Sequence, residues 1–154
     1  MISSFESELF ASGFVTGLTK YSDHYPQFEH QNNIVIRIVP ANKEHIGTEA
    51  VIDTAGQCTL DPALAKLWGL TEDQGAKSAL RIRGRKYDGF LVRKEIVIEA
   101  LSGRSINVDT TFFVPILDED ENWDKPNFIG LDGFLNRIRS AIDPSEKIFF
   151  FAKL

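Results

Sequence analysis

The sequence predicts an all-β fold, a mainly antiparallel barrel or sandwich with one or two short helices. Three observations predict it. About eight short runs are rich in β-branched and aromatic residues, and glycine-bearing turns separate many of them. Only two segments carry a helical pattern, and both are short. Strands do not alternate with long helices and no repeat of solenoid period occurs, which disfavours a parallel α/β sheet and a solenoid.

The length and composition are those of one ordinary domain. The chain has 154 residues, of which 43% are hydrophobic and 25% charged, so disordered and fibrous classes have no compositional support. Its 12 phenylalanines can fill a packed core. Residues 1–32 mix small and polar residues with brief apolar clusters, and they predict an N-terminal extension whose structure the sequence leaves open. We expect the folded domain to span residues 33–154.

The first half of this domain predicts two strands and a helix. Residues 34–40 are a β-branched run that ends at a proline, which is typical of a largely buried strand. Residues 49–53 predict a second strand. Residues 61–69 predict a short helix, because an N-capping aspartate and a proline suited to the first turn open it and a glycine ends it.

The second half predicts a meander of hairpins, a helix and a last strand. Residues 80–114 hold several β-type runs, and Asp88-Gly89 between the first two is typical of a tight hairpin turn. Apolar residues from Leu131 to Ile142 share the spacing of one helix face, and Asp143-Pro144 ends that pattern. Residues 148–152 are aromatic and apolar and predict the terminal strand.

Charge and cysteine content disfavour several function classes. The formal net charge of −5 argues against a nucleic-acid partner, since phosphate binding relies on clustered cations. One cysteine, Cys58, allows no internal disulfide and no multi-cysteine metal site, so we expect no metal and no cofactor. No apolar run approaches the ~18 residues of a membrane span, and the start of the chain lacks the features of a signal peptide. We therefore expect a cytoplasmic protein without a membrane partner.

The segment from Ala50 to Gly56 is the sharpest local feature. A buried apolar run leads directly into Asp53, Thr54, Ala55 and Gly56. An acid at this place is costly unless it is paired or hydrogen-bonded. The small residues after it let the backbone turn and bring its N–H groups close to the carboxylate, and the threonine hydroxyl can join a supporting network. An acid that only caps a turn at the strand end explains the same residues.

A second segment, residues 127–135, places an apolar pair and Gly130 before a further apolar run. Together, Val51-Ile52-Asp53-Thr54-Ala55-Gly56 and Phe128-Ile129-Gly130-Leu131-Asp132 resemble the retropepsin-like aspartic proteases. Leu60-Asp61-Pro62 and Ile142-Asp143-Pro144 resemble small soluble bacterial members of this group. In that family an apolar strand ends in the catalytic acid, and a later apolar-apolar-Gly strand crosses behind it. The resemblance covers about residues 33–154.

The resemblance implies an acid-protease barrel that acts as a homodimer and cleaves peptide or protein substrates. One Asp53 from each subunit would share a proton, so that one activates water and the other protonates the scissile carbonyl oxygen. Thr54 would brace the pair. The hairpin tip at residues 84–89 would be the flap that closes over an extended peptide, and the terminal strand would lie near the dimer contact. The substrate-binding residues implied are Ala55, Gly56, Gly84, Tyr87 and Gly89.

One residue departs from the family pattern. The family has Gly and then Ala after Asp-Thr, whereas this chain has Ala55 and then Gly56. Ala55 keeps the backbone N–H but adds a Cβ at a crowded two-fold axis, and a displacement of about 1 Å can cost ~10²-fold in rate. The alternative hypothesis is therefore a catalytically impaired dimer of the same fold that binds an extended peptide or a partner protein.

Other candidate sites are weaker. A Cys58–His nucleophilic pair would form only if the fold happened to bring one of the three histidines, which all lie upstream, into contact with Cys58. Residues 118–124 superficially resemble a calcium loop, but Trp123 stands where that loop needs glycine and Ile129 where it needs glutamate. A solvated loop is the simpler interpretation. The first hairpin carries four basic residues, Arg81, Arg83, Arg85 and Lys86. Such residues are typical of an exposed strand that resists aggregation.

Overall fold

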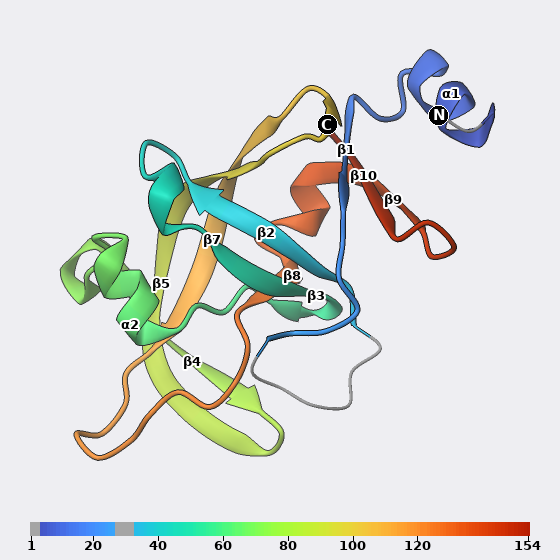
Figure 1. Cartoon of the computed structure of the whole chain (residues 1–154). Helices are drawn as coiled ribbons and strands as arrows, with labels where there is room; N and C mark the ends of the chain where they lie inside the picture. The colour runs from blue at the N-terminus through green and yellow to red at the C-terminus, as the bar shows by residue number, and fades with distance from the viewer. Residues whose placement is uncertain (1–3, 27–32) are drawn as a thin grey trace.

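A computed structural model describes residues 4–26 and 33–154 of the chain (Figure 1). These residues form two β-sheets, two α-helices and three short 3₁₀ turns. The all-β prediction is confirmed. Within the described ranges the strands do not close into a barrel, so the barrel expected from the resemblance is not found. None of the helices in these ranges is long and apolar enough to cross a membrane.

The larger sheet carries the middle of the chain. Its strands follow the order β4-β5-β2-β3-β8, and β7 pairs with β5. All of these pairs are antiparallel except β3 with β8, which is parallel. The strands are β2 (Val35–Pro40), β3 (Thr48–Gln57), β4 (Ala76–Ile82), β5 (Arg85–Ile98), β7 (Ile106–Pro115) and β8 (Phe128–Asp132). The predicted strands at residues 34–40 and 49–53 are therefore confirmed as β2 and part of β3.

The smaller sheet joins the two ends of the chain. Its order is β6-β1-β10-β9, with β1 (Gly17–Lys20), β6 (Ser102–Gly103), β9 (Ile138–Asp143) and β10 (Ile148–Lys153). Figure 1 shows the N-terminal strand beside the C-terminal hairpin. Val15 and Leu18 pack with Ile148 and Phe150 in one buried cluster. Gly17–Lys20 of the predicted N-terminal extension is thus built into a sheet, and residues 1–3 and 27–32 lie outside the described residues.

The helices are short and peripheral. Helix α1 spans Ser4–Ala11 and α2 spans Pro62–Leu67. The capping pattern that predicts α2 is confirmed, since the side chain of Asp61 accepts a hydrogen bond from the backbone N–H of Ala63 at 2.8 Å. The 3₁₀ turns are Glu44–Ile46, Glu72–Gln74 and Leu135–Arg137.

The predicted helix from Leu131 to Ile142 is wrong. That segment contains the end of β8, one 3₁₀ turn and β9. The chain turns at Gly133, where φ is +95°, and β9 then pairs with β10 along its whole length. Leu131 and Ile142 are 49% and 38% exposed, so the apolar spacing does not mark a buried face. Sheet pairing has overridden a local helical periodicity.

The predicted hairpin turn at Asp88-Gly89 is also misplaced. The turn between β4 and β5 is Arg83-Gly84, where both residues have positive φ, as a tight primed turn requires. Residues 85–89, which the resemblance assigns to the flap tip, lie within β5. Gly89 has a different purpose there, because a Cβ on it would lie 2.2 Å from the carbonyl oxygen of Val114 on the neighbouring strand.

Candidate functional site

Asp53 lies in β3, directly beside β8. Val51, Ile52 and Asp53 pair in parallel with Phe128, Ile129 and Gly130. The register then shifts. Asp53 pairs with Gly130 and Gln57 with Asp132, so more residues of β3 than of β8 lie between these two pairs. The extra residues form a bulge in β3 immediately after the acid, and bulges of this kind re-aim side chains next to functional sites.

The bulge holds the carboxylate of Asp53 with its own backbone. Oδ1 accepts a hydrogen bond from the N–H of Ala55 at 3.0 Å. A Cβ at position 56 would lie 2.6 Å from Oδ2, so Gly56 leaves the space that the carboxylate occupies. Ala55 therefore keeps the contact that a glycine would make. Asp53 is half-buried, while Thr54 and Ala55 are exposed.

The chain wraps around β8 at this point. Before the bulge, β3 pairs with one side of β8, and after it Thr59 pairs with Phe128 on the other side, donating a hydrogen bond to its carbonyl oxygen and accepting one from its N–H. Between the two, the backbone passes over Gly130, where a Cβ would lie 2.2 Å from the carbonyl oxygen of Gly56. Only glycine fits beneath this crossing. The arrangement locks the Asp53 bulge onto the apolar-apolar-Gly strand.

Cys58 is part of the crossing chain and is fully buried. Its Sγ accepts a hydrogen bond from the N–H of Gly130 at 3.3 Å. Burial raises the pKa of the Cys58 thiol to about 12, so it is protonated at neutral pH and is a poor nucleophile. The two histidines in the described ranges are His24, which bonds Asp23, and His45, both exposed, while His30 lies outside those ranges. The geometry favours a structural thiol over a Cys–His pair.

A long hairpin formed by β4 and β5 carries the predicted flap residues. Gly84 is in its turn, whereas Tyr87 and Gly89 lie further along β5. Tyr87 is buried: its hydroxyl accepts a hydrogen bond from Lys125 Nζ at 2.9 Å, and its ring meets that of Trp123 edge-on at 5.6 Å. Tyr87 thus anchors the hairpin to the loop at residues 116–126.

A small cavity lies under the hairpin turn and is bounded by the part of β3 that precedes the Asp53 bulge. It has a volume of about 180 Å³ and is lined by Ile82 and Arg83 of the hairpin, by Val51 and Phe128, and by the loop at residues 124–126. Val51 precedes Asp53 by two positions, and Phe128 precedes Gly130 by two, so these side chains share the face of the sheet that carries the carboxylate. The period-two pattern around Asp53 could have indicated Val51 from the sequence. The hairpin and loop contacts have no local sequence pattern.

The remaining predicted features have structural explanations. Glu121 of the acidic loop pairs with Arg85 at 2.7 Å, and this hydrogen bond lowers the pKa of the Glu121 carboxyl. Arg81 donates to the carbonyl oxygen of Gly84 at 2.9 Å and stays exposed, as expected for a solvated hairpin. In residues 4–26 and 33–154 no group of three or more His, Cys, Asp or Glu side chains is arranged to hold a metal ion.

Comparisons with known proteins gave no match to any family model, curated protein or solved structure. The candidate site at Asp53 is therefore assigned from its own geometry: a half-buried carboxylate held by a backbone bulge, a crossing that admits only glycine, and a cavity on the same face. This arrangement presents one fixed carboxylate to solvent. It can accept a proton, orient a water molecule or bind a donor group of a ligand.

Proposed function

We propose that this chain is an aspartic endopeptidase that acts as a homodimer, with Asp53 of each subunit in one shared site. The observation that supports it best is the crossing at Gly130, which fixes the Asp-Thr-Ala-Gly bulge against an apolar-apolar-Gly strand. This relation between the acid and a later glycine strand is the one that the resemblance to retropepsin-like proteases implies. A turn-capping acid would need no such crossing.

In the proposed mechanism the two Asp53 carboxyl groups face each other across the two-fold axis. Like charges so close cannot both ionise, so the pair holds one proton. The ionised member takes a proton from water as the water attacks the peptide carbonyl carbon, and the protonated member donates to the carbonyl oxygen. The Ala55 N–H keeps each carboxylate in place, and the exposed Thr54 hydroxyl braces the second subunit.

The substrate in this proposal is an extended peptide. It lies between the β4–β5 hairpin and the Asp53 face, where backbone groups bind it as an added strand. The cavity of about 180 Å³ takes one side chain next to the scissile bond, with its apolar part against Val51, Phe128 and Ile82 and its end near Arg83, Asp124 and Lys125. Because Tyr87, near the turn, fixes the hairpin to the loop, only the tip with Arg83 and Gly84 moves as a flap.

The dimer contact in this proposal lies around the bulge. Strand β10 pairs on one side with β1 and on the other with β9, so the terminal strand has no free edge for a second copy. Near Asp53, by contrast, Thr54 and Ala55 are exposed and Leu131, next to Gly130, is 49% exposed. A second subunit would cover these residues and bring the two acids together.

The alternative of an impaired dimer that binds an extended peptide without cleaving it rests on Ala55. Its methyl group is exposed at the surface where the second subunit would pack. A contact there can hold the two acids apart. The same hairpin, cavity and dimer then bind a peptide without hydrolysing it, and Ala55→Gly would restore cleavage.

The proposal is tested by incubating the purified protein with a peptide library between pH 3 and 8. We expect cleavage with a bell-shaped pH dependence, because activity needs one ionised and one protonated carboxyl group. Mass spectrometry identifies the cut bonds, and light scattering establishes the mass of the active species. A folded dimer that cleaves no peptide across this range would contradict the enzyme and favour the binding protein.

A further inference from the structure

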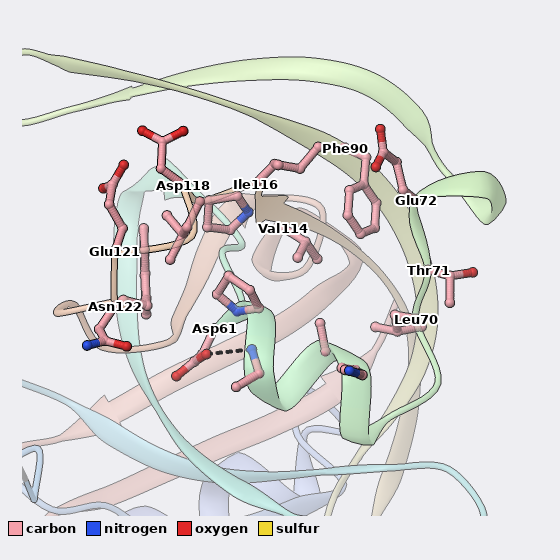
Figure 2. A pocket seen from close by; sticks show the side chains of 17 residues that line it. Asp61, Leu70, Thr71, Glu72, Phe90, Val114, Ile116, Asp118, Glu121 and Asn122 are labelled. Carbon is pink, nitrogen blue, oxygen red and sulfur yellow. Dashed lines mark hydrogen bonds between the residues drawn. The ribbon is translucent and has the colours of Figure 1, made fainter.

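A larger cavity among the described residues is separate from the Asp53 face. It has a volume of about 560 Å³ and lies between helix α2, strand β5, the end of β7 and the loop at residues 116–123 (Figure 2). This volume is in the range of ~300–1,000 Å³ that is typical of ligand sites. The peptidase proposal does not use it.

The inner wall of this cavity is apolar. Phe90 from β5 and Val114 from β7 form one side, and Leu70 follows helix α2 on another. Ile116, which also lines the cavity, is 47% exposed. A ligand that covered it would remove apolar surface from water.

The rim is acidic. In Figure 2, Asp118 and Glu121 stand on one side of the cavity, Glu72 on the other, and Asp61 at the base near α2. One cation, Lys66, also lines the cavity. Arg85 neutralises Glu121 from outside, Asp118 is hydrogen-bonded to Glu121, and Asp61 is engaged in capping α2, which leaves Glu72 as the carboxylate most available to a ligand. The rim therefore carries excess negative charge around an apolar interior.

Trp123, in the cavity wall, has a buried hydrogen-bond donor without an acceptor in the described part of the chain. Its indole Nε1 is buried, and no described residue accepts a hydrogen bond from it. A buried donor without an acceptor costs about 1–3 kcal/mol. A carbonyl group supplied by a ligand could accept from it only after a movement of the indole that brings this N–H to the cavity. The other tryptophan, Trp68, is fully buried and donates to the carbonyl oxygen of Ile46 at 2.8 Å.

The geometry points to a second binding site in this cavity, one that takes a peptide segment with a basic side chain beside an apolar one. The apolar side chain packs against Phe90, Val114 and Ile116, and the guanidinium or ammonium group lies at the acidic rim against the carboxylate of Glu72, while Asp118 and Glu121 on the opposite side add negative charge. Charge complementarity selects this occupant over an acidic or purely apolar one. The site does not depend on Asp53 being catalytic.

The test follows the two indole N–H resonances in ¹H–¹⁵N NMR spectra, assigned with the Trp123→Phe variant. The probe is acetyl-Leu-Arg-Leu-amide, and the matched control is the same peptide with citrulline, which has nearly the shape of arginine but no charge. We expect the arginine peptide to shift the Trp123 resonance in a saturable way and to leave Trp68 in place. The citrulline peptide is expected to bind about tenfold more weakly.

Variants locate the charge that is recognised. The double variant Glu72→Gln/Asp118→Asn is expected to lower the affinity for the arginine peptide about tenfold, whereas the exposed Glu99→Gln is expected to leave it unchanged. Equal affinity for the two peptides, or no saturable change at Trp123, would overturn the proposal. Asp53→Asn should keep the binding, so loss of this site and loss of the peptidase activity are separate outcomes.

Discussion

Replacing Asp53 with asparagine is expected to abolish peptide cleavage, with a loss of at least about 10³-fold in kcat/KM. The amide has the same size, and its oxygen can still accept the hydrogen bond from the Ala55 N–H, so the bulge should keep its shape. It cannot take a proton from water or share one with the second subunit. Cleavage should therefore disappear while the unfolding midpoint and the dimer mass remain.

A matched substitution controls for a general effect of removing a carboxylate. Asp120 is exposed in the acidic loop, and Asp120→Asn changes the net charge by the same amount. We expect this variant to retain wild-type cleavage. If Asp53→Asn cleaves the library as fast as the wild type does, Asp53 is not the catalytic acid.

The second large effect is expected for Gly130→Ala. A Cβ at this position would lie 2.2 Å from the carbonyl oxygen of Gly56 and 2.6 Å from the carbonyl carbon of Gln57. Both neighbours are backbone atoms of the crossing chain, so neither can move aside as a flexible side chain would. The free energy of unfolding should fall by at least about 3 kcal/mol, measured by chemical denaturation.

Gly13→Ala is the control for this substitution. Gly13 has φ of +74°, and a Cβ there would have no heavy atom within 4 Å. Alanine at this position would therefore strain the backbone without a steric clash. That strain is worth about 1–2 kcal/mol. A Gly130→Ala protein as stable as the Gly13→Ala protein would show that the chain does not cross Gly130 at such close range.

The elements that could be predicted from the sequence are those fixed by local chemistry. The β-branched residues of β2 and β3 favour strands by themselves, and Asp61 caps α2 whatever surrounds it. The unusual step from a buried run into Asp53 also lies within a few residues. A local sequence pattern is therefore sufficient to identify Asp53 and Gly56 as candidate site residues.

The elements that could not be predicted depend on distant partners. The apolar spacing from Leu131 to Ile142 fits a helix, yet pairing with β10 makes most of it strand. Asp88-Gly89 has the residues of a turn, but Gly89 is needed where β5 approaches Val114 closely. The contact of Tyr87 with Trp123 and Lys125, and both cavities, join segments that are far apart in the sequence.

The central claim, that two chains share one pair of Asp53 residues, is tested most directly by mixing subunits. Wild-type protein is equilibrated with an about ninefold excess of Asp53→Asn protein, at concentrations where light scattering shows both to be dimers, and cleavage is measured per wild-type subunit. Random exchange leaves about one tenth of the wild-type subunits paired with each other, so the activity should fall about tenfold. Unchanged activity per wild-type subunit would show that one chain cleaves alone and would contradict the shared site.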